Sequence, residues 1–174
     1  MSGLKLIKPR VFKDERGYFY ESTFNKESFS KIGIHDEFIQ DNQSLSNKGI
    51  LRGMHFQCPP HAQGKLVRVI KGAVQDVVID IRKNSPTYGQ HFSVELTEEN
   101  FLMMYVPQGF AHGFATLEDS TIFAYKCTDT YHPETEAGLA WDDKEFGIDW
   151  KIQNPILSEK DKTNEPFSLF VSPF

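Results

Sequence analysis

The sequence predicts an all-β domain of the barrel or sandwich type. Stretches in which apolar and polar residues alternate recur between residues 66 and 128, the pattern of strands with one buried face. Turn residues, such as those of Asn84–Gly89 and Pro107–Gly109, separate these stretches at short intervals. Short strands that follow one another in this way favour a barrel or sandwich over βαβ units.

Length and composition fit one globular domain that spans residues 1–174. The hydrophobic content of 39% and the charged content of 25% are ordinary for such a domain, and fifteen phenylalanines indicate an aromatic core or cavity. The net charge of −5 comes without a basic tract, so we do not expect nucleic acid as a partner. A local basic pocket for a small anion remains compatible with this charge.

Cellular location is predicted from what the sequence lacks. Cys58 and Cys127 form neither a metal-binding pair nor a disulfide framework, so we expect free thiols in a reducing compartment. The N-terminus has no apolar region typical of a signal peptide. No stretch approaches the roughly 18 apolar residues of a membrane span. We therefore expect a cytoplasmic protein without a membrane partner.

The N-terminal part predicts two short strands around a charged turn. Residues 4–12 alternate loosely and end at Asp14–Gly17. Tyr18–Glu21 then forms an aromatic strand, with Phe19 facing opposite to its two tyrosine neighbours.

A short helix and a further strand follow. Asn25–Ile32 predicts a helix that its own first residue caps and that Gly33 ends. Phe38–Ser44 returns to extended structure, and the spacing of Gln40 and Asn42 places both side chains on one face of that strand.

The remaining strands predict the body of the domain. A tight hairpin is expected at Lys71-Gly72, because strands of residues 66–70 and 73–81 flank this dipeptide. Further strands are predicted at residues 91–96, 101–106, 114–117 and 121–128. From Thr135 the pattern loosens, and we expect this segment to wrap the outside or one mouth of the barrel.

The stretch Leu51–Val69 concentrates residues that carry chemistry. Arg52 and Lys65 can hold an anion or a developing negative charge, and His55 can transfer protons near neutral pH. A surface loop with solvated charges is the alternative for each residue alone. The group, flanked by alternating segments, favours a site mounted on a sheet.

A second motif, PxGxxH, ends at His112 and is typical of cupin-type jelly-roll barrels. Metal-binding cupins also carry an HxH pair, but Gln57 stands where the second histidine of that pair would be. Because a closed metal shell usually needs three or more protein ligands, we expect no metal here. His112 either binds a ligand or is a buried histidine hydrogen-bonded to the backbone.

Taken together, these motifs resemble the dTDP-4-dehydrorhamnose 3,5-epimerase family over nearly the whole chain. The matching segments are Arg16–Glu21, Gln40–Ser44, Leu51–Gln57, Gln63–Val67, Asp80–Arg82, Ser85–Gly89, Gly109–Phe114, Tyr125–Thr128 and Leu157–Asp161. The resemblance implies a cupin-type jelly-roll barrel with short peripheral helices. It also implies an isomerase that inverts C3 and C5 of a dTDP-4-keto-6-deoxyhexose without a cofactor or a metal, in dTDP-rhamnose biosynthesis.

Catalytic roles follow from the resemblance, motif by motif. It implies that His55 is the base, with Asp161 as the carboxylate that orients it. Lys65 is implied to stabilise the enolate oxygen, and Tyr125 to donate a proton from the opposite face of the sugar. Tyr131 is the residue most easily confused with Tyr125.

Substrate contacts also follow from the resemblance. It implies that Tyr131 stacks on the base together with Phe19 from a neighbouring subunit, so that a homodimer shares its sites. Arg52 and Arg16 are implied to contact the diphosphate, because a guanidinium fork suits phosphate oxygens. The further substrate-binding residues we expect are Glu21, Gln40, Asn42, His112 and Lys160. His61 receives no role.

Other functions remain open at this stage. A relative that epimerises one carbon, or a ketoisomerase, would carry almost the same motifs. A metal-dependent cupin or a non-catalytic sugar-nucleotide binder belongs to a different class. The set of His55, Lys65, Tyr125 and Asp161 argues against the binder, because binding alone needs no base and acid.

Overall fold

The structure is a computed structural model that describes residues 1–22 and 24–174. Its strands, in chain order, are β1 (Lys5–Ile7), β2 (Val11–Asp14), β3 (Gly17–Tyr20), β4 (Gln40–Ser46), β5 (Leu51–Gln57), β6 (Lys65–Lys71), β7 (Ala73–Asp80), β8 (His91–Thr97), β9 (Met103–Val106), β10 (Phe110–Thr116), β11 (Thr121–Cys127) and β12 (Glu136–Gly138). Its helical segments are α1 (Lys26–Lys31) and the short 3-10 turns η1 (Pro133–Thr135), η2 (Asp161–Thr163) and η3 (Phe167–Leu169).

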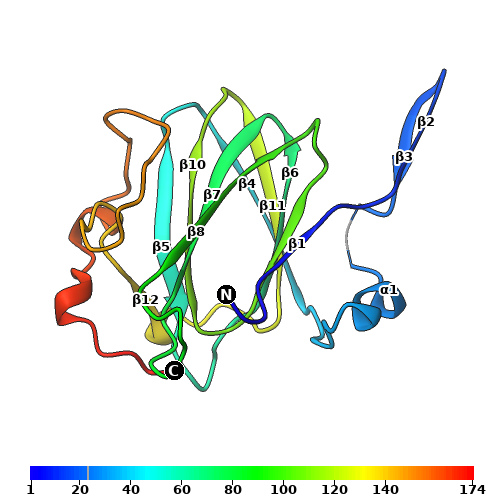
Figure 1. The fold of residues 1–174 in the computed structure, drawn as a ribbon. Coiled ribbons are helices and arrows are strands. Elements are labelled where there is room, and N and C mark those ends of the chain that lie inside the picture. Colours follow the sequence, from blue (N-terminus) through cyan, green and yellow to red (C-terminus); the bar gives the residue numbers. More distant parts are fainter. Residues whose placement is uncertain (23) are drawn as a thin grey trace.

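Two five-stranded antiparallel sheets face each other and enclose the core (Figure 1). The first sheet has the order β1-β9-β6-β11-β4, and the second has the order β12-β5-β10-β7-β8. Val67 and Phe123 of the first sheet pack between them against Val78 and Phe114 of the second. The predicted all-β barrel with short peripheral helices is confirmed.

The outer faces of the sheets are covered by segments from the two ends of the chain. Phe146, Phe167 and Phe170, from the C-terminal segment, pack on the outside of the second sheet. Phe29 of α1 and the following Ile34 pack on the outside of the first sheet. The C-terminal segment therefore wraps the barrel as predicted, and phenylalanines fill this outer layer as well as the core.

The predicted hairpin at Lys71-Gly72 is wrong. β6 pairs with β9 and β11 in the first sheet, whereas β7 pairs with β8 and β10 in the second. The dipeptide therefore carries the chain from one sheet to the other. Gly72 has φ +79°, and a Cβ there would lie 2.3 Å from Thr121 Oγ1, so close packing also requires glycine.

Other predicted boundaries shift by a few residues. The strand expected at residues 114–117 is the end of a longer strand that begins at Phe110, so His112 lies within β10. The strand expected from residue 101 begins only at Met103, because Phe101 has φ +57°. The helix is confirmed, with Asn25 accepting a hydrogen bond from the Ser28 N–H.

Cys58 and Cys127 are free thiols. Within residues 1–22 and 24–174, no helix has the length and apolar character needed to cross a membrane.

Candidate active site

The site lies inside the barrel, in a cavity of about 420 Å³ between the two sheets. The second sheet contributes His55 and His112, and the first contributes Lys65 and Tyr125. Phe114 and Phe123 supply apolar lining. Residues far apart in the sequence thus meet because β5, β6, β10 and β11 place alternate side chains inward.

A hydrogen bond joins His55 Nε2 to Asp161 Oδ1. Asp161 is only 3% exposed. Burial alone would raise the pKa of its carboxyl group, but the hydrogen bond and charge of His55 hold the net pKa below the ordinary value. Asp161 is therefore held as a carboxylate, and His55 Nδ1 is the ring nitrogen that remains to accept a proton.

The chain delivers Asp161 to this position by anchoring the C-terminal segment to the start of β5. Ile156 forms a parallel bridge with Ile50, and the Leu51 N–H donates to the Ile156 carbonyl at 3.0 Å. The Asp161 N–H then donates to Ser158 Oγ at 3.1 Å, which fixes the turn.

Gly53, two residues before His55, and Gly113, next to His112, let β5 and β10 approach closely. Gly53 has φ +149°, and a Cβ there would lie 2.6 Å from Gly113 Cα. The register is irregular at this point, and His55 stands opposite His112. The close approach thus sets both histidines side by side on one wall of the cavity.

Lys65 and Tyr125 occupy the opposite wall. Burial lowers the pKa of the Lys65 ammonium, although the nearby Cys127 and Asp76 oppose this change. Burial raises the pKa of Tyr125, and Cys127 adds to the shift. The phenol therefore keeps its proton at neutral pH. The acidic groups near Lys65 favour its ammonium form, against the effect of burial.

His112 is a buried histidine, but its partner is a side chain rather than the backbone. Its Nε2 lies 3.0 Å from both carboxylate oxygens of Asp76. Burial raises the pKa of Asp76, while His112 acts in the opposite direction. Sequence reasoning missed Asp76, although an acidic residue inside the apolar strand β7 was the available signal.

A second pocket, with a volume of about 340 Å³, adjoins the 420 Å³ cavity. The two share His55, Lys65 and Tyr125. Gln40, Asn42 and Tyr131 line the second pocket. The Tyr131 N–H donates to Gln40 Oε1 at 3.0 Å, and Gln40 Nε2 donates to Asn42 Oδ1 at 3.1 Å. These three predicted contacts are brought together.

Glu136 organises this second pocket and was missed in the sequence. It accepts a hydrogen bond from the Tyr131 hydroxyl at 2.5 Å and forms an ion pair with Lys160. Burial would raise the pKa of Glu136, but Lys160 and then Tyr131 hold it below its ordinary value. Its position on the short edge strand β12 gave no periodic signal.

Gln57 ties two loops together. Its Nε2 donates to the His61 carbonyl at 2.7 Å, and its Oε1 accepts from the His132 N–H at 2.8 Å. Gln57, which stands where metal-binding cupins carry the second histidine of their HxH pair, therefore holds these two loops in place.

Some predicted contacts lie elsewhere in the single chain. Arg52 lines the 420 Å³ cavity, and its Nε–H donates to Ser46 Oγ at 3.3 Å. Arg16 and Phe19 lie on the β2–β3 hairpin, which projects away from the barrel (Figure 1). Arg16 pairs with Asp14 at 2.5 Å, and Glu21 accepts from Asn25 at 3.1 Å. One chain does not bring Arg16, Phe19 and Glu21 to the cavity.

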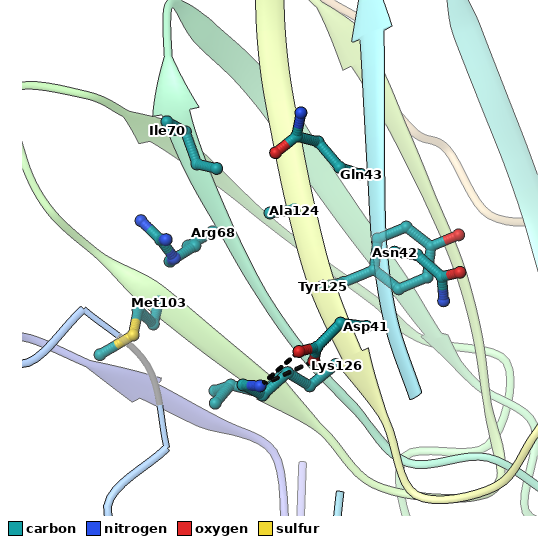
Figure 2. A pocket seen from close by; sticks show the side chains of 10 residues that line it. Asp41, Asn42, Gln43, Arg68, Ile70, Met103, Ala124, Tyr125 and Lys126 are labelled. Atoms are coloured by element: carbon teal, nitrogen blue, oxygen red, sulfur yellow. Dashed lines mark hydrogen bonds and ion pairs between the residues drawn. The ribbon is translucent and has the colours of Figure 1, made fainter. Parts of the chain in front are cut away.

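A different groove, about 260 Å³, lies on the outer face of the first sheet (Figure 2). Lys126 pairs with Asp41 there at 2.7 Å, and Ile70 and Met103 are apolar neighbours. Lys126, Asp41 and Ile70 alternate with the residues that face inward. Tyr125, however, lines both this groove and the cavity that holds the histidine–aspartate pair, and Asn42 lines both this groove and the second pocket.

A polar cavity with a histidine–carboxylate pair on one wall and a lysine and a tyrosine on the other is typical of isomerases that move protons next to a carbonyl group. The sequence profile of dTDP-4-dehydrorhamnose 3,5-epimerase matches residues 1–168. The chain belongs to the dTDP-4-dehydrorhamnose 3,5-epimerase family, and it is an isomerase of dTDP-sugar metabolism.

Individual relatives agree with this assignment. The dTDP-4-dehydrorhamnose 3,5-epimerase of Methanothermobacter thermautotrophicus is 50% identical over 169 residues, covering 95% of this chain and 90% of the relative. The crystal structure of the Bacillus anthracis enzyme, with TDP and PPi bound, has a TM-score of 0.93 at 44% identity and covers 95% and 94% of the two chains. The Legionella pneumophila dTDP-6-deoxy-D-glucose-3,5-epimerase, in complex with dTDP-4-keto-L-rhamnose, also has a TM-score of 0.93, at 46% identity, covering 98% and 91%.

Proposed function

We propose that this chain converts dTDP-4-dehydro-6-deoxy-D-glucose into dTDP-4-dehydro-L-rhamnose by inverting C3 and C5. The observation that carries the proposal is the placement of His55 and Tyr125 on opposite walls of one cavity. Inversion needs a proton to leave one face of a carbon and another proton to arrive on the opposite face. The family assignment and the sugar nucleotide bound to the Legionella pneumophila relative support the substrate class.

The first step is removal of a proton next to the C4 ketone. His55 Nδ1 accepts the proton, while Asp161 holds Nε2–H and stabilises the imidazolium that forms. Electrons from the broken C–H bond move onto the ketone oxygen, and Lys65 stabilises the negative charge there. The ketone is itself the electron acceptor, so the step requires neither a cofactor nor a metal.

The second step returns a proton to the other face. Tyr125 donates its phenolic proton to the enolate carbon, and the ketone reforms. The raised pKa of Tyr125 keeps this acid protonated before the transfer. Solvent then restores the proton of Tyr125 and removes the one on His55, so that the same residues can act at the second carbon.

This proposal is tested by incubating the enzyme with dTDP-4-keto-6-deoxyglucose in deuterated water and analysing the sugar by NMR. We expect deuterium at both C3 and C5 of a product with both centres inverted. Label at one carbon only would replace the proposed reaction with a single-carbon epimerisation, and a shifted ketone would indicate a ketoisomerase.

Lys65 is expected to control the alkaline side of the pH profile. Its lowered pKa means that the ammonium of the free enzyme loses its proton below the ordinary value of 10.5, so kcat/KM should fall in that range as pH rises. Lys65→Met should lower kcat by roughly 10²–10³-fold, as for other oxyanion-stabilising groups, and the residual activity should lack this alkaline decline. Steady-state rates between pH 6 and 11 measure both effects. An unchanged decline in Lys65→Met would assign it to another group.

Nucleotide binding is proposed to involve a second subunit. Phe19 is 69% exposed on a hairpin that projects from the barrel. Tyr20, on the same hairpin, accepts a hydrogen bond from Arg68 at 3.2 Å, which joins the hairpin to the groove on the outer face of the first sheet. An aromatic strand and a neighbouring groove left open in one chain favour a homodimer in which each subunit supplies Phe19 and Arg16 to the other's site.

Mixing two defective variants tests whether sites are shared. Phe19→Ala should raise KM, because an aromatic ring stacked on a base contributes about 1–3 kcal/mol. A heterodimer of Phe19→Ala and His55→Ala chains would contain one site with both residues intact. Co-refolding of the two variants should therefore restore turnover at the low KM of the native enzyme. If the mixture keeps the high KM of Phe19→Ala, the sites are not shared in this way.

A further inference from the structure

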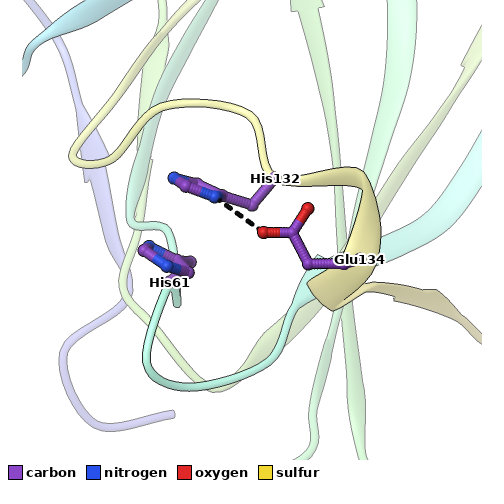
Figure 3. A group of neighbouring side chains, drawn as sticks. All are labelled: His61, His132 and Glu134. Atoms are coloured by element: carbon purple, nitrogen blue, oxygen red, sulfur yellow. Dashed lines mark hydrogen bonds and ion pairs between the residues drawn. The ribbon is translucent and has the colours of Figure 1, made fainter.

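A cluster of metal-ligating side chains lies outside the cavity and has no part in the proposed reaction (Figure 3). It consists of His61, His132 and Glu134, which we call the loop cluster. His61 lies on the connection between β5 and β6, and the other two lie where the chain leaves β11 and enters η1. One nitrogen or oxygen atom from each of the three side chains lies within 4.8 Å of the other two.

We propose that the loop cluster binds one divalent transition-metal ion, such as Zn²⁺. Two imidazoles and a carboxylate are a ligand set that Zn²⁺ accepts, with water in the fourth position. His132 Nδ1 and Glu134 Oε1 are already 3.0 Å apart, close to the roughly 3.4 Å between two ligands of a tetrahedral zinc ion. The ion would take the place of the proton that joins these two atoms.

Hydrogen bonds outside the cluster assign the nitrogen that each ring would offer. His61 Nδ1 lies 3.1 Å from Asp129 Oδ2, so Nδ1–H can donate to this carboxylate and leave Nε2 for the ion. His132 Nε2 lies 3.2 Å from Thr130 Oγ1, so a proton on Nε2 leaves Nδ1 free beside Glu134. Partners of this kind fix the orientation and basicity of metal-binding histidines.

The backbone around the cluster is already positioned. Gln57 bonds to the His61 carbonyl and to the His132 N–H, so one buried amide holds both loops at a fixed separation. The two rings are stacked with centroids 3.4 Å apart and an interplanar angle of 9°. Because each lone pair lies in the plane of its ring, parallel rings cannot direct both lone pairs at one ion, and binding requires the rings to tilt toward a common point. His61 and His132 are half-buried and Glu134 is exposed, so these side chains have room to rotate.

The consequence of binding would be structural. None of the three side chains lines the cavity or the second pocket among the described residues, whereas Tyr131, next to His132, lines the second pocket. A bound ion would join the two loops and restrict the segment that carries Tyr131. We therefore expect metal to raise thermal stability and leave kcat unchanged.

The test is metal binding by the full chain after treatment with a chelator. Titration with Zn²⁺ against a chromophoric chelator should give one tight site per chain, and Co²⁺ should give the absorption of a low-coordinate complex. Zn²⁺ should also raise Tm. The double variant His61→Gln/His132→Gln should weaken binding by at least about 100-fold and lose the rise in Tm, and Asp129→Asn should weaken binding about 10-fold.

His35→Gln is the matched control, because His35 is an exposed histidine far along the chain from the cluster. It should bind Zn²⁺ as the native chain does. Equal affinity in the native chain and the double variant would overturn the proposal, and so would a loss of the site in His35→Gln. Because the readout is binding and Tm, a failure of the proposed epimerase reaction would not affect the outcome.

Discussion

Replacing His55 by alanine is expected to abolish both epimerised product and the exchange of substrate protons with deuterated water. Without the His55 imidazole in the cavity, the proposed base that takes the proton next to the ketone is lost, so the enolate forms far more slowly. The expected loss in rate is roughly 10²–10⁴-fold, the usual range for a general base. Proton NMR of the sugar, recorded over time, measures exchange and product together.

Asp161→Asn provides the matched variant for this prediction. It keeps the size of the side chain but offers an amide to His55 Nε2, which favours the wrong tautomer. Exchange and product formation should therefore fall in parallel, as is expected for His55→Ala. Normal exchange in His55→Ala would mean that another residue is the base.

Replacing Tyr125 by phenylalanine is expected to separate exchange from inversion. The substitution removes only the phenolic hydroxyl, so His55 and Lys65 still form the enolate. Inversion should fall by roughly 10²–10⁴-fold, the range for a general acid, while deuterium continues to enter the substrate. Tyr131→Phe is the control. Its ring keeps its faces for stacking and loses only the bond to Glu136, so inversion should be near normal.

Much of the fold was predictable because local patterns coincide with the final structure. The helix has a capping residue and a glycine stop, and glycine- and proline-containing turns separate short apolar strands such as β7 and β10. The failure at Gly72 has a specific cause. A short glycine-containing connection is compatible with a hairpin and with a crossing between two packed sheets, and only the pairing of distant strands decides between them.

The site was predictable where a motif carries several chemical groups. His55 and Lys65 are close in the sequence, and the resemblance added Tyr125 and Asp161, which the barrel brings to the same cavity. Asp76 was missed because an acidic residue within an apolar strand shows no function in the sequence. Its role becomes visible only when the fold places it beside His112.

The loop cluster was missed for a similar reason. His61 was assigned no role because it lies in a proline-rich loop, and its neighbours His132 and Glu134 come from a loop that is distant in the sequence. Contacts between loops depend on how the loops pack, and no periodic pattern in the sequence predicts them.

The central claim is that one wall of the cavity removes a proton and the opposite wall returns one. The most direct test is the configuration at the labelled carbons of sugar recovered from Tyr125→Phe in deuterated water. We predict deuterium at C3 or C5 with the original configuration, because His55 returns the label to the face from which it took the proton. Deuterium in carbons that are inverted at the native rate would contradict the claim.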